Sequence, residues 1–156
     1  MGIKKTYKRH IEQLKESIVN YYGERLVSIV LFGSLARGTA TPESDADILL
    51  IVEKLHKRKM KRIEEFIDNI EDKIGDTPFY ISPIIKTPLE AAAGSPLFLD
   101  MVDDSVILYD KGEFFKKVLD KLRHRLNELG SKRIFKGSRW YWILKPGLKP
   151  GEVFEI

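Results

Sequence analysis

Apolar residues recur every three or four positions in three stretches of the chain, and each stretch predicts an amphipathic helix. The helices end at Gly23, at Gly75 and at Gly130, since glycine commonly follows the last helical turn. Two shorter helices are predicted near residues 87–90, where Thr-Pro-Leu-Glu is a helix start, and near 96–102. The apolar positions of the long helices are Ile3, Tyr7, Ile11, Leu14, Ile18 and Tyr22; Ile63, Phe66, Ile67, Ile70 and Ile74; and Phe115, Val118, Leu119, Leu122, Leu126 and Leu129.

Four short runs of apolar and β-branched residues predict strands. Pro83 favours an edge position for the third run, because proline cannot donate a hydrogen bond to a neighbouring strand. The first two runs are apolar on both faces, which is typical of a sheet covered by helices on both sides. Before the last long helix the order is α-β-β-α-β-α-β, and we therefore predict an α/β (α+β) fold, a small mixed sheet with helices packed on it. The four runs are Leu26–Phe32, Ala46–Val52, Phe79–Ile85 and Val106–Tyr109.

The composition is that of a folded globular domain, with 156 residues of which 43% are apolar and 32% charged. The absence of cysteine excludes disulfides, thiolate metal sites and cysteine nucleophiles. No apolar run reaches the roughly 18 to 20 residues of a membrane span, and the N-terminus lacks an apolar signal core. We therefore expect a soluble cytoplasmic protein. Four Asn and Gln among many Lys, Arg and Glu favour a thermophilic source.

Charge is unevenly distributed along the chain, whose net charge is +4. Residues 1–62 hold 13 basic and 7 acidic side chains, residues 63–113 hold 3 and 12, and residues 114–156 hold 11 and 4. Basic ends permit binding of nucleotide phosphates or of a nucleic acid, but solvated helix faces produce the same pattern. The charge pattern therefore permits nucleic-acid binding, but solvated helix faces are the favoured interpretation.

The stretch Leu31–Val52 combines a strand, a Gly-Ser pair and two aspartates. Asp45 and Asp47 open the second strand two positions apart, so their carboxylates point to one face of the sheet. Two like charges that close favour an oxygen-preferring divalent cation such as Mg²⁺, which carboxylates and substrate phosphates hold together. Gly33 permits close approach of a phosphate to the backbone, and Ser34 and the following amides provide donors for it.

Gly33-Ser34-x-Ala36-Arg37-Gly38, followed after a spacer by Ser44-Asp45-x-Asp47, resembles the signature of the DNA polymerase beta-like nucleotidyltransferase superfamily, in particular its minimal archaeal and bacterial members. The resemblance implies that an acceptor hydroxyl attacks the α-phosphorus of a nucleoside triphosphate, with ATP as the default, and that pyrophosphate leaves. It implies two Mg²⁺ ions held by Asp45 and Asp47 as catalytic residues, and a triphosphate held by Gly33 and Ser34 with support from Arg37 and Ser44. The acceptor is unknown, although some minimal members modify a small helical partner protein as its antitoxin.

The superfamily's third carboxylate, which belongs on a later strand, is missing from the predicted strand Phe79–Ile85. A flanking acid could replace it, two carboxylates could hold the metal alone, or the domain could be a catalytically silent nucleotide- or partner-binding module. The flanking acids are Asp76, Glu90, Asp100, Asp103 and Asp104.

The C-terminal part is the least regular in pattern. We divide the chain into a nucleotidyltransferase domain at 1–110 and, at 111–156, a helix with a Trp-rich tail packed on the same domain. Trp140, Tyr141 and Trp142 lie among Lys and Arg, as in proteins that stack on nucleic-acid bases. The favoured interpretation is that this tail folds back over the sheet and completes the core.

Overall fold

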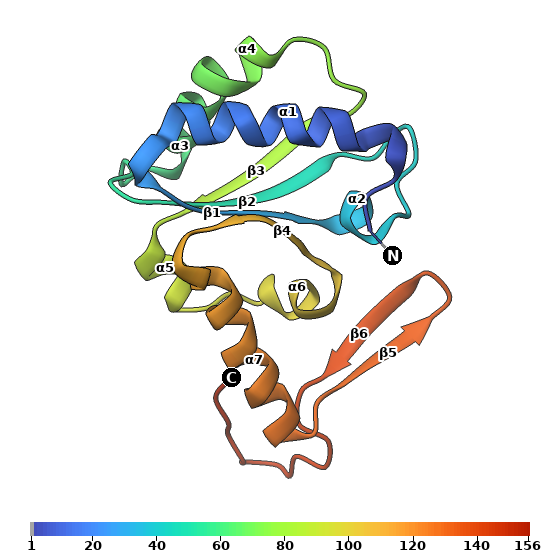
Figure 1. The fold of residues 1–156 in the computed structure, drawn as a ribbon. Coiled ribbons are helices and arrows are strands. Elements are labelled where there is room, and N and C mark those ends of the chain that lie inside the picture. The colour runs from blue at the N-terminus through green and yellow to red at the C-terminus, as the bar shows by residue number, and fades with distance from the viewer. Residues whose placement is uncertain (1) are drawn as a thin grey trace.

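A four-stranded mixed sheet forms the centre of the fold in a computed structural model that describes residues 2–156. The spatial order is β3-β2-β1-β4, with β1 antiparallel to both β2 and β4, and β2 parallel to β3 (Figure 1). The bounds are β1 Leu26–Phe32, β2 Ala46–Val52, β3 Ile81–Lys86 and β4 Val106–Asp110. The two central strands are almost wholly buried, as their continuous apolar sequences predict.

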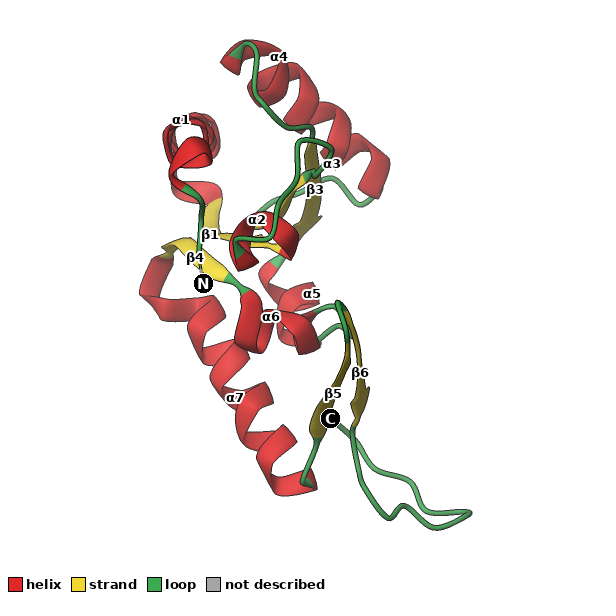
Figure 2. Ribbon diagram, turned by 90° about the vertical axis from the view of Figure 1, so that its right-hand side faces the viewer, coloured by secondary structure: helices red, strands yellow, loops and turns green. Residues whose placement is uncertain are grey.

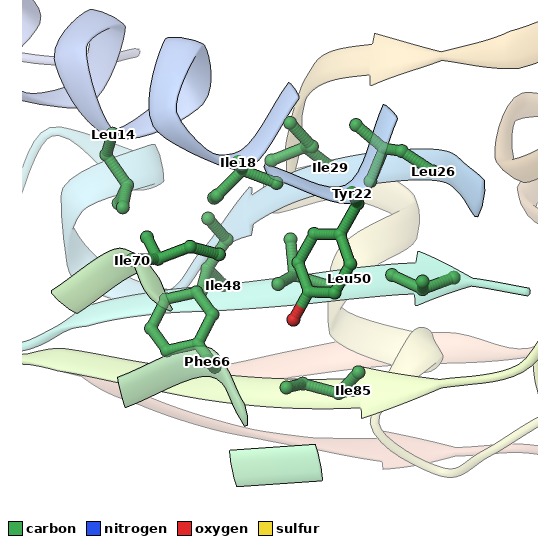
Figure 3. Packing of buried hydrophobic residues seen from close by; sticks show 11 residues of the cluster. Leu14, Ile18, Tyr22, Leu26, Ile29, Ile48, Leu50, Phe66, Ile70 and Ile85 are labelled. Atoms are coloured by element: carbon green, nitrogen blue, oxygen red, sulfur yellow. The ribbon is translucent and has the colours of Figure 1, made fainter. Parts of the chain in front are cut away.

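Helices cover both faces of this sheet, so the core has three layers (Figure 2). One face packs against α1 and the α3–α4 segment, through a cluster that includes Leu14, Ile18, Leu50, Phe66 and Ile70 (Figure 3). The other face packs against α5, α6 and α7. The helix bounds are α1 Lys5–Tyr22, α2 Gly33–Arg37, α3 Lys59–Phe66, α4 Asp72–Ile74, α5 Pro88–Ala92, α6 Phe98–Asp104 and α7 Phe114–Leu129. A π-helical segment, η2 Ile67–Glu71, joins α3 to α4, and two 3-10 turns are η1 Gly23–Arg25 and η3 Lys111–Glu113.

The predicted mixed α/β architecture is confirmed, and most boundaries fall within a few residues of those expected from the pattern. β1 and β2 have the predicted bounds, and β3 is an edge strand as Pro83 required. β3 begins two residues later than predicted, where Ile81 pairs with Ala46. The buried ring of Phe79, just before the strand, packs near Tyr7, with ring centres 6.0 Å apart. Among residues 2–156, no helix is long and apolar enough to cross a membrane.

The prediction that the C-terminal tail folds back over the sheet and completes the core is correct only in part. Trp142 and Leu144 pack against the core cluster on the α5–α7 side, but the tail does not lie over the central sheet itself. The tail forms an antiparallel hairpin of β5, Lys132–Lys136, and β6, Arg139–Ile143, which lies beside α6 and clear of the central sheet (Figure 1). Indole nitrogens of Trp140 and Trp142 donate to the same Oδ1 atom of Asp100 in α6, at 2.8 and 3.0 Å. Since α7 leads away from the sheet before Gly130 ends it, the tail reaches α6 rather than the sheet.

Candidate functional site

The turn from β1 into α2 places the Gly-Ser pair at the C-terminal end of the central strand β1. Gly33 has φ of +72°, a left-handed conformation that glycine adopts without strain, and the chain turns there directly into the short helix α2. Leu35 and Ala36 are buried and anchor this helix, whereas Ser34 and Arg37 remain half-buried. The short helix was not predicted from the sequence, because five residues are too few to show a helical period.

The loop between α2 and β2 is held by its own contacts and by the N-terminal segment. Lys4 Nζ donates to the carbonyl oxygen of Ala40 at 2.9 Å, and the amide of Thr41 donates to Ser44 Oγ at 2.9 Å. Ser44 therefore stabilises the turn that leads into the aspartates. Beside this loop, a surface hollow is bordered by the basic side chains of Lys4, Lys8 and Arg37.

Asp45 and Asp47 lie at the start of β2, where the register places Asp47 opposite Phe32, the residue before Gly33. Asp45 is exposed and Asp47 is half-buried. A Cβ placed on Gly33 would come within 2.2 Å of Asp47 Oδ2, so this carboxylate rests directly against the glycine backbone. The ladder between β1 and β2 thus brings the two halves of the motif together.

The site holds two neighbouring carboxylates, those of Asp45 and Asp47, and its electrostatics reflect their mutual repulsion. Burial raises the pKa of Asp47, the nearby charge of Asp45 raises it further, and the positive charge of Arg37 lowers it. One guanidinium thus offsets part of the negative charge of two carboxylates. The donors are all oxygens, and an added divalent cation would relieve the repulsion, so these residues fit Mg²⁺.

The structure brings no third carboxylate to this pair. In the parallel ladder between β2 and β3, Ser82 lies beside Asp47, and β3 contains no acidic residue. Within residues 2–156, no group of three or more His, Asp or Glu side chains could hold a metal. The donor set is therefore the pair Asp45 and Asp47 without a further acid from the described chain.

Most of the flanking acids serve other contacts. Glu90 pairs with the buried guanidinium of Arg62 at 2.9 Å, and Asp100 accepts from the two indoles of the hairpin. The neighbouring acids of α6 pair with basic side chains of α7 and β5: Asp103 with Arg123 and Asp104 with Arg133. These four acids therefore take part in ion pairs or hydrogen bonds elsewhere in the fold, and we do not assign them to the metal site.

A residue that the sequence did not assign to this site, Trp140, stacks on Arg37. The guanidinium carbon of Arg37 lies 4.9 Å from the centre of the Trp140 ring. The alternating run Arg139–Ile143 could have suggested a strand, but no local pattern connects it to a residue of α2.

Comparison with known proteins identifies the family of this chain. A family model described as "Nucleotidyltransferase domain" matches residues 11–124. A Methanocaldococcus jannaschii protein named "Putative protein adenylyltransferase" is 33% identical over 115 residues, covering 72% of this chain and 78% of its own length. A second protein of that organism and name is 36% identical over 52 residues, covering 33% of this chain and 52% of its own.

Two solved structures were also compared. A toxin–antitoxin crystal structure with AMP-PNP has 17% identity and a TM-score of 0.44, covering 81% of this chain and 94% of its own. A Sulfolobus solfataricus protein described as a "putative nucleotidyltransferase" has 22% identity and a TM-score of 0.42, covering 72% and 95%. The family model and the first relative decide the assignment, which agrees with the resemblance seen in the Gly33–Asp47 motif. The chain belongs to the nucleotidyltransferase domain family.

Proposed function

We propose that this nucleotidyltransferase transfers the adenylyl group of ATP to a hydroxyl group of a protein acceptor, with Asp45 and Asp47 as its catalytic carboxylates. The observation that carries the proposal is the half-buried carboxylate of Asp47, held against Gly33 and next to Asp45. The protein acceptor is supported by the name of the relative that is 33% identical over 115 residues.

In the proposed reaction, the acceptor oxygen forms a bond to the α-phosphorus of ATP, and the bond from this phosphorus to the bridging oxygen breaks. Pyrophosphate leaves, and the hydroxyl proton passes to a site carboxylate or to water. Catalysis of this kind depends mainly on positioning and on stabilisation of phosphate charge. The chain provides the backbone turn at Gly33, the hydroxyl of Ser34 and the guanidinium of Arg37 for the phosphates, while Ser44 maintains the loop.

Mg²⁺ is part of the proposal. The carboxylates of Asp45 and Asp47 would hold it together with the triphosphate, and when bound it would supply positive charge to the phosphoryl oxygens. The charge of Asp45, which after burial is the second cause of the raised pKa of Asp47, supports this assignment, because a bound cation would offset the repulsion between the two carboxylates.

The test is calorimetric titration of ATP, GTP, CTP and UTP with and without Mg²⁺, on the wild type and on the Asp45→Asn, Asp47→Asn double variant. We expect Mg²⁺-dependent ATP binding that the double variant loses. The Asp68→Asn, Asp72→Asn double variant, which removes two exposed acids, is the control for a change in net charge alone. Equal binding by the wild type and the double variant would contradict the proposal.

Transfer is measured separately, by incubating the protein with α-labelled ATP and cell extract and following label on protein bands. Labelled bands that require Asp45 and Asp47 support adenylyl transfer to protein. Metal-dependent binding without any labelled product would instead support the silent binding module.

A further inference from the structure

The C-terminal hairpin contacts the nucleotidyltransferase motif through a cation–π pair. Trp140 in β6 faces the guanidinium of Arg37 in the last turn of α2, with 4.9 Å between the guanidinium carbon and the ring centre. This distance lies within the range of a favourable cation–π interaction. The same guanidinium lies close enough to Asp47 to lower the pKa of that carboxyl against the effects of burial and Asp45. Arg37 therefore lies between the hairpin, through Trp140, and the part of the motif that contains Asp47.

The ring of Trp140 is itself held in place from several sides. Its Nε1 donates to Asp100 at 2.8 Å, and the guanidinium carbon of Arg133 lies 4.4 Å from the ring centre. Arg133 in turn pairs with Asp104, and the side chains of both residues are less than a tenth exposed. A tryptophan with these contacts presents a fixed face, since α6 and β5 determine its orientation.

We propose that Trp140 is a positioning residue of the nucleotide site, whose ring holds the Arg37 guanidinium at the end of α2, the short helix that begins at Gly33 against Asp47, ready to bind the phosphates of a nucleoside triphosphate. This inference rests on the proposed function. A long arginine side chain loses conformational freedom when it binds a ligand, and a stacked guanidinium has lost part of that freedom beforehand. Trp140 lies outside residues 11–124, so a segment beyond the matched family region contributes to the site.

The test compares Mg²⁺-dependent ATP affinity in the wild type, Trp140→Leu, Trp140→Phe, Arg37→Ala and the Arg37→Ala, Trp140→Leu double variant. Trp140→Leu is expected to weaken binding about tenfold, whereas Trp140→Phe retains an aromatic face and stays within about threefold of the wild type. Because Trp140 acts through Arg37, the double variant should bind no more weakly than Arg37→Ala. Wild-type affinity in Trp140→Leu, or additive losses in the double variant, would overturn the inference.

Trp142→Phe is the matched control, because Trp142 donates to the same Asp100 oxygen but packs against the core cluster on the α5–α7 side of the sheet. It removes an equivalent hydrogen bond and should leave ATP affinity unchanged. Thermal unfolding of Trp140→Leu confirms that the variant is folded. A loss of affinity in Trp142→Phe equal to that in Trp140→Leu would show that hairpin attachment, and not the stack on Arg37, is responsible.

If the proposed function itself is wrong, the wild type and all variants fail to bind ATP alike. A wild type that binds no triphosphate contradicts the nucleotide site itself. The contact between Trp140 and Arg37 is then tested independently, by the NMR signal of the Arg37 Nε–H group. That signal should carry a ring-current shift that Trp140→Leu abolishes and Trp142→Phe preserves. An Arg37 signal unchanged by Trp140→Leu would overturn the positioning role regardless of any activity.

Discussion

The Oδ2 atom of Asp47 lies 2.2 Å from the point where a Cβ on Gly33 would sit. The absence of a side chain at Gly33 is therefore what allows the carboxylate to occupy its position. This contact crosses the β1–β2 ladder and connects the first residue of α2 with the second residue of β2. The glycine thus serves two purposes, since its positive φ makes the turn and its missing Cβ makes room for the carboxylate.

Gly33→Ala is expected to displace the Asp47 carboxylate and to abolish Mg²⁺-dependent ATP binding, because a Cβ and Oδ2 cannot occupy the same space. The left-handed backbone adds about 1 kcal/mol of strain to the folded state. The measurement is calorimetric titration together with urea unfolding. Gly130→Ala is the matched control, with φ of +69° and nothing within 4 Å of an added Cβ. It should lose similar stability and retain binding, whereas equal binding by both variants would contradict the steric argument.

Asp47→Asn is expected to stabilise the metal-free protein at neutral pH. The folded-state pKa of Asp47 is raised, mainly by burial and next by Asp45, so its ionisation favours the unfolded chain. The stability that a protonated Asp47 provides is complete below the ordinary aspartate pKa and is lost as pH rises through the raised folded-state value.

Denaturant unfolding without divalent cations, between acidic and neutral pH, measures this difference. The advantage of Asp47→Asn over the wild type should grow as pH rises across that window, and Asp68→Asn provides the charge-matched control. Mg²⁺ with ATP should then raise the melting temperature of the wild type and not that of Asp47→Asn. A constant stability gap at all pH values would contradict the raised pKa.

Glu90→Gln is expected to cost about 1 to 2 kcal/mol of stability at neutral pH, because it removes the carboxylate facing the buried guanidinium of Arg62. Arg62 also donates to the carbonyl oxygens of His56 and Ile85, so the pair joins the start of α3 to β3 and α5. The hydrogen bond from Arg62 is the largest cause of the lowered pKa of Glu90. The contribution is therefore present above the ordinary glutamate pKa and is lost as pH falls through the lowered value.

The measurement is urea unfolding of Glu90→Gln at neutral and acidic pH. Glu64→Gln is the control, because its pair with Lys61 is about half exposed and should change stability by less than about 1 kcal/mol. Equal losses in the two variants, or a loss for Glu90→Gln that does not shrink in acid, would refute this role.

Asp110→Ala is expected to destabilise the fold by about 2 to 3 kcal/mol, since one carboxylate serves two structural purposes. It accepts the hydroxyl of the fully buried Ser28 at 2.7 Å, and it accepts the amides of Phe115 and Lys116 at the start of α7, both at 2.9 Å. Urea unfolding with an unchanged m-value measures the loss. Adding Ser28→Ala should recover part of it, because the buried hydroxyl left without a partner is then absent. A double variant less stable than Asp110→Ala would contradict this assignment.

Local patterns in the sequence were sufficient for the long elements and for the motif. The periods of α1 and α7 and the apolar runs of β1 and β2 reflect burial along each segment, so they are visible without knowledge of its neighbours. The Gly33–Asp47 motif lies on two consecutive elements, and the family it resembles is the one that the comparisons identify. The spacing of Asp45 and Asp47 on a strand also predicted that their carboxylates share a face.

Only the tertiary structure decided which distant residues meet. The acids Glu90, Asp100, Asp103 and Asp104 look alike in the sequence, yet their partners come from α3, α7 and the hairpin. The same holds for Trp140, whose contact with Arg37 depends on how α7 ends and on the indole hydrogen bond to α6. Such contacts have no local signature, because their free energy comes from side chains brought together by the packing of the whole chain rather than from the conformational preference of any one segment.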